Sequence, residues 1–360
     1  MDVGLALIFQ GSDPSMTDKY VYDNEIRLGL MAEELGFQSI WGVEHHFTDY
    51  TMCPDVLQFL TYFAAKSDKL LLGSMVVVLP WHDPMRVAEE ISMLDNLSDG
   101  RFILGIGRGL GRVEFEGFGR DMNVSREYFT ESAQMLLQGL ETGTCEFNGN
   151  LIQQKARDIR PAPLKSFKGR TYAAAVSPES SKIMAELGVG ILIIPQKPWE
   201  HVEKELAEYR AIYKEVHAEE APAPILGGWT FCDEDAGRAE EMARKYIGGY
   251  YLTVVQHYEM QGNHFKDTKG YESYVTMQEM ANTDVQSMIE FFMSIQVWGT
   301  PEQCYDRIRL FTERTGAGAY NGVFSFAGMP YADVEKSMRL FSREVMPQVK
   351  LLPGKPLIER

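Results

Sequence analysis

Cysteine, basic charge and long apolar runs are all scarce in this sequence. The 360 residues include four cysteines, with no Cys-x-x-Cys pair among them: Cys53, Cys145, Cys232 and Cys304. Cysteines spaced in this way exclude a zinc ribbon and a disulfide-stapled scaffold. No apolar run is long enough to span a bilayer, and the N-terminal MDVGLALIF has no basic n-region. We therefore expect a reduced, cytoplasmic protein with no membrane partner.

Acidic residues outnumber basic ones, 51 to 35, which gives a formal net charge of −16. Such an excess opposes duplex binding, because neutralising phosphates requires a cationic surface. Nucleic acid is therefore not an expected partner, although a local arginine can still hold a small anionic cofactor. The hydrophobic share of 45% and charged share of 24% are those of an ordinary globular protein.

Short apolar runs, bounded by turn residues, recur along the whole chain. They are apolar on both faces, which is typical of strands in a parallel sheet covered by helices. We predict strands at 3–9, 39–45, 70–79, 102–107, 171–176, 189–195, 224–232 and 321–327.

Amphipathic helices are predicted between these strands. The segment 24–35 carries an apolar stripe and is followed by Gly36, and 87–97 repeats apolar residues at helical spacing. Thr300-Pro301-Glu302-Gln303 has the pattern of a capping box with proline at the first helical position. About eight βα units in one chain favour a (β/α)8 TIM barrel, with an open doubly wound sheet as the alternative.

We draw a single domain over residues 1–360, because the chain has no internal repeat and no Pro/Ser linker. The polar stretch 256–298 interrupts the alternation before the last predicted strand. An insertion of this size is either a mobile lid over the barrel or a plain surface excursion.

Two histidines follow the second predicted strand, in the sequence Glu44-His45-His46. Active sites of barrels gather at the carboxyl ends of strands, so these histidines are candidates for general acid/base catalysis. A buried structural role is the alternative. Adjacent side chains on an extended chain point to opposite faces, so His45 and His46 should not share one metal ion. No other His/Cys/Asp cluster has ligand spacing, and we predict no metal site.

Two further strand ends favour anion binding. Gly107-Arg108-Gly109 follows the fourth predicted strand, where glycines let a ligand approach the backbone and the guanidinium can grip an oxyanion. Ser177-Pro178 begins a helix after the fifth, and a helix N-terminus suits a phosphate group. The alternatives are a tight turn with a surface arginine and simple helix capping. Trp229, near the end of the seventh strand, faces either an aromatic cofactor or the barrel core.

Several of these segments, in this order and spacing, match a known family. They include Glu44-His45-His46-Phe47-Thr48, Asp99-Gly100-Arg101-Phe102, Arg108-Gly109-Leu110, Gly299-Thr300-Pro301 and Val345-Met346-Pro347. The chain resembles the bacterial luciferase-like, flavin-dependent monooxygenases, and most of all their catalytic α subunits. The resemblance implies a (β/α)8 barrel, usually dimeric, that binds FMN at its C-terminal face.

The resemblance also assigns roles by position. His45 would be the catalytic histidine with His46 lining the same site, and Glu114 would be an acidic residue near the flavin and the substrate pocket. The resemblance assigns the remaining cofactor contacts to two sets of residues. Met75 and Val76 would form a cis peptide beneath the flavin ring, and Arg108, Ser177 and Ser180 would bind the phosphate.

Some positions depart from the family pattern. Gly107 stands in place of a reactive cysteine close to the flavin, and Val176 in place of a glutamate in the phosphate region. Ile193 and Ile194 lie around the position of a tryptophan near the ring. These departures indicate a monooxygenase that need not emit light.

The resemblance therefore implies one half of a two-component system. A separate NAD(P)H:flavin reductase would supply reduced FMN, and dioxygen would form a flavin hydroperoxide that oxygenates a small hydrophobic substrate such as an aldehyde or a ketone. The small or apolar pocket residues, including Trp229, favour such a substrate. We expect a homodimer. The alternatives are a deazaflavin-dependent oxidoreductase and a noncatalytic flavin-binding partner subunit.

Overall fold

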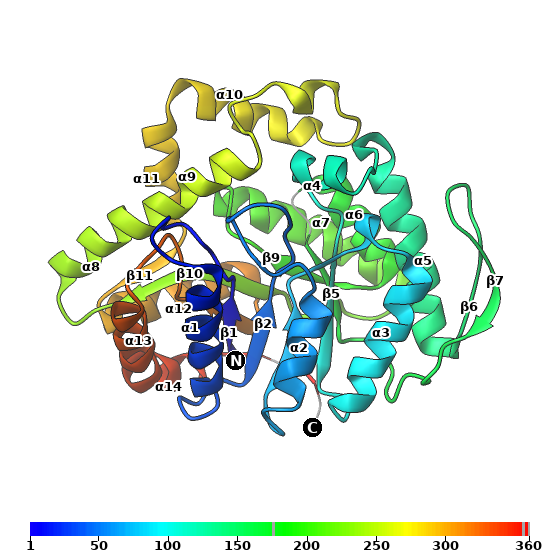
Figure 1. Ribbon diagram of the computed structural model, residues 1–360, viewed down its shortest axis with the longest axis horizontal. Coiled ribbons are helices and arrows are strands. Elements are labelled where there is room, and N and C mark those ends of the chain that lie inside the picture. The colour runs from blue at the N-terminus through cyan, green and yellow to red at the C-terminus, as the bar shows by residue number, and fades with distance from the viewer. Residues whose placement is uncertain (175–176, 355–356, 359–360) are drawn as a thin grey trace.

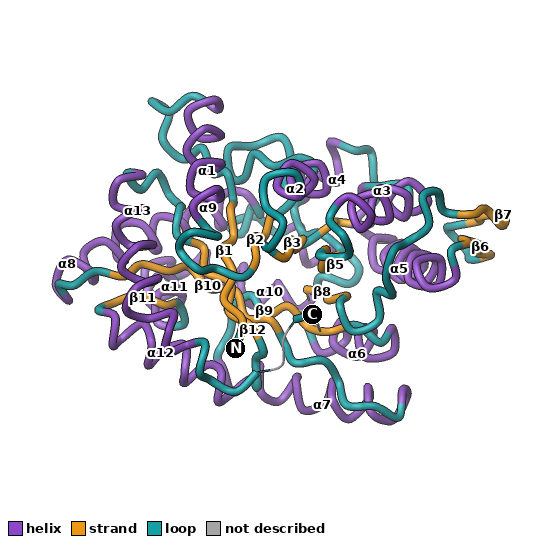
Figure 2. The backbone as a smooth tube through the Cα atoms, turned by 90° about the horizontal axis from the view of Figure 1, so that it is seen from below, coloured by secondary structure: helices purple, strands orange, loops and turns teal. Residues whose placement is uncertain are grey.

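The computed structural model describes residues 1–174, 177–354 and 357–358. A closed parallel β-barrel forms its centre, surrounded by helices (Figures 1 and 2). Within the described residues the barrel has eight strands: β1 (Asp2–Leu7), β2 (Ser39–Gly42), β3 (Leu71–Ser74), β5 (Phe102–Gly107), β8 (Thr171–Ala174), β9 (Gly190–Ile193), β10 (Ile225–Cys232) and β12 (Ala319–Val323).

Parallel pairing continues around the whole ring. Ala6 of β1 pairs with Trp41 of β2 on one side and with Val323 of β12 on the other. The ring closes where Ile225 of β10 pairs with Leu192 of β9 and, on its other side, with Ala319 of β12. The (β/α)8 prediction is thus confirmed over an open sheet, because an open sheet would leave two strand edges unpaired.

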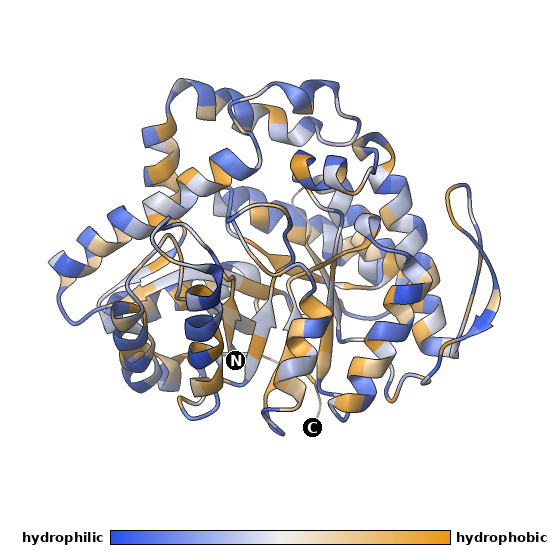
Figure 3. Cartoon of the chain, viewed as in Figure 1, coloured by the Kyte–Doolittle hydropathy of each residue, from blue (hydrophilic) through white to orange (hydrophobic). Residues whose placement is uncertain are grey.

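Helices cover the outside of the barrel with their apolar faces inward, so that polar residues face solvent (Figure 3). They are α1 (Asp18–Met31), α2 (Val56–Ala64), α3 (Pro84–Leu97), α4 (Arg112–Gly117), α5 (Ser125–Thr142), α6 (Pro178–Leu187), α7 (Trp199–His217), α12 (Pro301–Thr315), α13 (Tyr331–Leu340) and α14 (Met346–Val349). None of the described helices is long and apolar enough to cross a bilayer.

Helix boundaries follow the capping residues. Helix α1 begins earlier than the predicted 24–35, because the Thr17 side chain accepts a hydrogen bond from the Tyr20 amide and fixes the first turn. It ends at Met31, and Gly36 provides the left-handed turn that follows (φ 87°). The capping box of Thr300 and Gln303 is confirmed at the start of α12.

The predicted strand 70–79 is interrupted. β3 ends at Ser74, the Met75–Val76 peptide bond is cis, and pairing with β5 resumes in β4 (Val77–Val78). The Ser74 hydroxyl donates to the Gly105 carbonyl (2.9 Å) and accepts from the Gly105 amide (2.8 Å), which anchors β5 just before the break. The cis peptide that the family resemblance implied at this position is confirmed.

Additional structure separates β10 from β12, where the sequence predicted an insertion before the last strand. It comprises α8 (Ala236–Met242), α9 (Gly248–His257), α10 (Val275–Thr283), α11 (Val285–Ser294) and β11 (Val297–Gly299), and so begins before residue 256. Helices α9 to α11 lie above the barrel end in Figure 1. The hairpin of β6 (Thr144–Asn148) and β7 (Gln153–Asp158), which projects at the side, was not predicted, because its exposed polar sequence resembles a loop.

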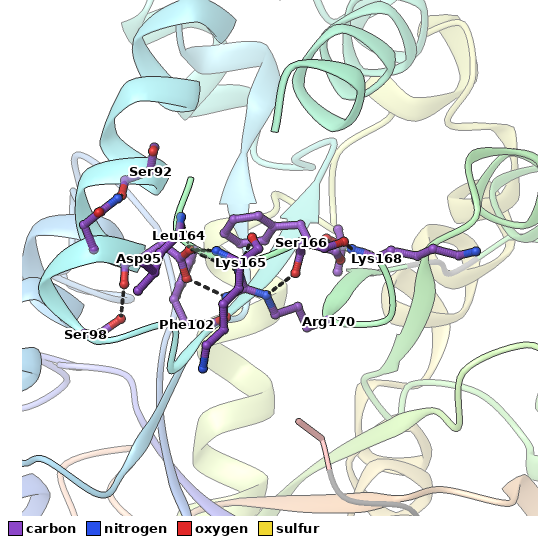
Figure 4. A network of polar contacts seen from close by, with 12 residues as sticks. Ser92, Asp95, Ser98, Phe102, Leu164, Lys165, Ser166, Lys168 and Arg170 are labelled. Carbon is purple, nitrogen blue, oxygen red and sulfur yellow. Dashed lines mark hydrogen bonds and ion pairs between the residues drawn. The ribbon is translucent and has the colours of Figure 1, made fainter. Parts of the chain in front are cut away.

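A buried ion pair ties α3 to the start of β8 (Figure 4). The Arg170 guanidinium binds both carboxylate oxygens of Asp95 (2.6 and 3.1 Å) and donates to the backbone carbonyls of Phe102, Lys165 and Ser166. Asp95 also accepts from the amides of the loop before β8. Every strong donor and acceptor of the pair is therefore engaged, as a buried ion pair requires.

Candidate active site

Two adjoining pockets open at the carboxyl ends of the barrel strands. They adjoin one another and are together called the cavity, because five residues line both: His45, Met75, Ile194, Gln196 and Tyr258. One pocket extends toward Arg108 and the start of α6, and the other lies under the insertion, among aromatic side chains. His45 lies at the junction of the two.

Glu114 holds the His45 ring in place. Helix α4 carries Glu114, whose Oε1 lies 2.9 Å from His45 Nδ1 and also accepts the His46 backbone N–H (3.0 Å). On the other side of the ring, the Tyr258 hydroxyl lies 3.5 Å from His45 Nε2. When the carboxylate accepts the Nδ1–H, neutral His45 presents the lone pair of Nε2 toward the cavity.

Glu114 stays ionised in this buried position. Burial raises the pKa of its carboxyl group, but the nearby His45 and His257 rings outweigh that effect and lower the pKa to about 2. An ionised carboxylate can only accept hydrogen bonds, which fixes the direction of its bond with His45. Glu114 lies behind His45 and is not among the residues that line the cavity.

His46 points away from the cavity. Its Nε2 lies 3.1 Å from Glu44 Oε1, and the ring packs edge-on against Trp81 and Phe118. Glu44 also accepts from His82 (2.6 Å) and from the amide of Val78 in β4. Although burial raises the pKa of Glu44, the bonds from His46, His82 and Val78 lower it overall. The two histidines thus have separate carboxylate partners, and His46 does not line either pocket.

The cationic end of the cavity combines two arginines with the start of α6. Arg108 and Arg126 both donate to the Gly270 carbonyl of the insertion (2.8 and 2.9 Å), and the Tyr271 ring stacks on the Arg108 guanidinium. The Ser177 hydroxyl caps α6 and lies 2.8 Å from the Ser180 hydroxyl. Ser180 lines the cavity and Ser177 does not. Val176 lies outside the described residues.

The middle of the cavity is apolar, and its lining residues are tightly packed against one another. Met75, Val76, Gly107 and Ile194 line it. A Cβ atom on Gly107 would lie 2.3 Å from Cγ2 of Val76, so the Val76 side chain already fills the space that a residue larger than glycine would need. Glycine at position 107, where the family pattern has a cysteine, therefore leaves the space that the Val76 side chain occupies.

Aromatic side chains enclose the second pocket. Trp229 of β10 packs against Tyr250 and Phe292 of the insertion, with ring centroids 4.4 and 5.4 Å apart. The Tyr250 hydroxyl hydrogen-bonds that of Tyr50 at 2.6 Å. Trp229 lines this pocket and is also part of the hydrophobic core.

Sequence reasoning missed three residues of this site: Arg126, His257 and Tyr258. Arg126 is the second residue of α5, and a search of the sequence for a second cation near the Gly107-Arg108-Gly109 segment could have found it. His257 and Tyr258 end α9, more than 200 residues from His45, and only the folding of the insertion brings them to it.

Comparison with known proteins places this chain in a family. The profile of the luciferase-like monooxygenases matches residues 1–318. The chain belongs to this family. The alkanal monooxygenase alpha chain of Photorhabdus luminescens is 28% identical to this luciferase-like monooxygenase over 350 residues, 94% of each chain. The predicted class of enzyme is thereby confirmed.

Solved structures share the fold of this luciferase-like monooxygenase. A monooxygenase from Streptomyces bottropensis superimposes with a TM-score of 0.77 at 22% identity, covering 96% of this chain and 99% of the other. The oxygenating constituent of 3,6-diketocamphane monooxygenase from Pseudomonas putida, solved with FMN, gives 0.75 at 18% identity (98% and 100% covered). The coenzyme F420 dependent tetrahydromethanopterin reductase of Methanopyrus kandleri gives 0.66 at 20% identity (97% and 99% covered). The fold thus occurs with both cofactors.

Proposed function

We propose that this luciferase-like monooxygenase binds reduced FMN and oxygenates a small hydrophobic substrate with dioxygen. One observation carries the proposal: the cavity runs from a pair of arginines, through an apolar middle, to an aromatic pocket, with His45 at the junction. A molecule with an anionic tail and a flat aromatic ring matches this order of environments. Bound reduced FMN would supply the electrons that activate dioxygen.

The phosphate end would be held by Arg108 and Arg126. Guanidinium groups bind phosphate through charge-assisted hydrogen bonds, and the N-terminus of α6 adds backbone N–H groups and the Ser180 hydroxyl. Met75, Val76 and Ile194 would contact the ring. Gly107 leaves room for the Val76 side chain, which occupies the space that a larger residue at position 107 would need.

His45 would move protons beside the ring. The Glu114 carboxylate holds Nδ1 and leaves Nε2 on the cavity side, where it can accept a proton from the reacting group and return it. Tyr258 and the aromatic residues around Trp229 exclude water from the same space. The lining of this pocket supports an apolar aldehyde, ketone or ring compound as substrate.

The cofactor test compares FMN with riboflavin, which has the same ring without the phosphate. We expect Arg126→Gln to weaken reduced FMN binding about 10- to 100-fold, which corresponds to the loss of a hydrogen bond between charged groups. Riboflavin binding should hardly change. Arg160→Gln, at an exposed arginine, is the matched control. Tighter binding of a deazaflavin cofactor than of FMN would instead favour the F420-dependent alternative.

The oxygen reaction is tested by rapid mixing. We expect the chain loaded with reduced FMN, when mixed with oxygenated buffer, to give an absorbance transient that outlasts that of free reduced FMN. His45→Ala should lower substrate oxygenation about 10²-fold if proton transfer at Nε2 is essential. Reoxidation indistinguishable from that of free flavin would contradict the proposal, and unchanged oxygenation in His45→Ala would remove His45 from it.

We further infer that the chain works in the cytoplasm as a homodimer, with an NAD(P)H:flavin reductase as a separate source of reduced FMN. Exposed apolar side chains on the neighbouring helices α2 and α3, namely Tyr62, Met93 and Leu97, support an interface between copies. Light scattering after gel filtration measures the mass of the assembly. A monomer at micromolar concentration would contradict this inference.

A further inference from the structure

Three side chains from distant parts of the sequence meet behind the cavity: His45 after β2, Glu114 of α4 and His257 at the end of α9. Glu114 Oε1 lies 2.9 Å from His45 Nδ1 and 3.6 Å from His257 Nε2. One ligand atom from each residue lies within 4.8 Å of the other two. Two imidazoles and a carboxylate therefore surround a single point.

Two polar atoms of this cluster are buried without a hydrogen-bond partner among the described residues. They are Glu114 Oε2 and His257 Nε2, on side chains that are 0% and 1% exposed. The other nitrogen of the His257 ring lies 3.0 Å from the Thr48 hydroxyl, and the Tyr50 ring stacks on its face. These contacts fix the ring so that Nε2 is directed at the carboxylate. Buried polar groups normally have partners, so the cluster has unused capacity to bind.

The donor set is one that transition-metal ions prefer. Zn²⁺ binds imidazole nitrogen and carboxylate oxygen at about 2.0–2.2 Å, and ligands of a tetrahedral ion then lie about 3.4 Å apart. The two contacts of Glu114 Oε1, at 2.9 and 3.6 Å, lie on either side of that separation. Small shifts of the side chains would therefore complete three ligands, and water can supply a fourth.

A second hollow reaches His257 from outside the cavity. Thr48, Asp49 and Glu259 line it along with His257. Arg112 pairs with Glu259, which leaves Asp49 as an acidic group at this opening. A cation in this hollow would therefore lie next to His257 and an acidic side chain, outside the cofactor cavity.

We propose that His45, Glu114 and His257 form a binding site for a divalent transition-metal ion, with Zn²⁺ as the ion that fits best. The ion replaces the proton on His45 Nδ1 and binds Glu114 Oε1 and the unpartnered Nε2 of His257. A neutral imidazole bound to metal through Nδ1 carries its proton on Nε2, so His45 no longer presents a lone pair to the cavity. The metal therefore inhibits proton acceptance by His45, a consequence that rests on the proposed function, whereas the binding itself does not.

Calorimetric titration of the chelator-treated chain with ZnCl₂ tests the site. We expect one Zn²⁺ per chain in the wild type and at least a 100-fold loss of affinity in His257→Gln, which keeps a polar group beside Thr48 but removes the imidazole. The matched control is His201→Gln, at an exposed histidine of α7, which should bind Zn²⁺ as the wild type does. Unchanged affinity in His257→Gln, or no binding by the wild type, overturns the proposal.

A second measurement needs no variant. The X-ray absorption spectrum of the wild-type Zn²⁺ complex should show two imidazoles and an oxygen donor, and a thiolate or a single-imidazole shell would overturn the site even if His257→Gln failed to fold. Oxygenation is measured separately. Loss of Zn²⁺ binding in His257→Gln would support the metal site whatever the activity of the chain. A wild-type chain that binds Zn²⁺ but never oxygenates a substrate would contradict the proposed function alone.

Discussion

At the scale of single residues, the placement of one carboxylate decides what His45 can do. Glu114 accepts from Nδ1 and from the backbone of His46, and so fixes both the ring and the strand end that carries it. The neighbouring His46 has the same chemistry but a different partner, Glu44, and is turned into the aromatic packing around Trp81. Adjacent histidines of equal intrinsic reactivity thus come to lie in different surroundings.

A second buried carboxyl group, that of Glu25 in α1, makes the free energy of unfolding depend on pH. Burial raises its pKa to about 7, with partial offset from the hydroxyls of Ser325 and Tyr331. Between the unfolded value of 4.5 and about 7, only the folded state keeps the proton, so the free energy of unfolding decreases as pH rises through this window. The loss is ~3 kcal/mol at most and is complete above pH 7.

We therefore expect Glu25→Gln to raise the melting temperature at pH 8 more than at pH 5, because the amide remains neutral at both. Differential scanning calorimetry at the two pH values measures this difference. Glu208→Gln, at an exposed glutamate of α7, should show no such dependence. An equal shift of Glu25→Gln at both pH values would show that Glu25 does not titrate in this window.

At the scale of secondary-structure elements, polar contacts position the strands around the site. Arg170 and Asp95 join the start of β8 to α3 at the opposite end of the barrel from the cavity. Ser74 links β3 to β5 just before the cis peptide. These contacts hold β3, β5 and β8 in position relative to their neighbours, and Met75 and Gly107 lie at the carboxyl ends of β3 and β5.

Removing one partner of the buried ion pair should be costly. We expect Arg170→Met to lower the free energy of unfolding by about 3–5 kcal/mol, because Asp95 is left charged and buried. The matched control is Arg86→Met, whose partner Glu90 lies one helical turn away in an exposed pair, with an expected loss of about 0–1 kcal/mol. Urea unfolding followed by circular dichroism compares the two. Equal losses would contradict a special role for the buried pair.

At the scale of the whole molecule, the insertion between β10 and β12 completes the site. Its residues supply Tyr250, His257 and Tyr258 to the cavity region and place the Gly270 carbonyl on Arg108 and Arg126. Tyr271 stacks on Arg108 and donates a hydrogen bond to the Gly109 carbonyl (3.0 Å). We propose that residues 256–298 open and close over the cavity, with Tyr271 as the principal contact of the closed state.

Limited proteolysis tests this motion. Trypsin should cut at the exposed Lys266 or Lys269, and Tyr271→Ala should speed cleavage because the open form gains population. Tyr271→Phe keeps the stacking on Arg108 and loses the hydrogen bond to Gly109, so its cleavage rate should lie between those of the wild type and Tyr271→Ala. Tyr20→Ala, at an exposed tyrosine of α1, serves as the control. A cleavage rate that Tyr271→Ala leaves unchanged would show that this contact does not hold the segment closed.

The sequence by itself determined the barrel, the family and most of the residues at the strand ends. Hydrophobic runs and capping residues are local signals, and His45 and Arg108 follow closely after strands whose carboxyl ends must converge in a barrel. The tertiary structure alone decided which groups meet across long separations. The different partners of His45 and His46 and the approach of His257 to Glu114 depend on how the insertion and the loops pack, and no local pattern records that packing.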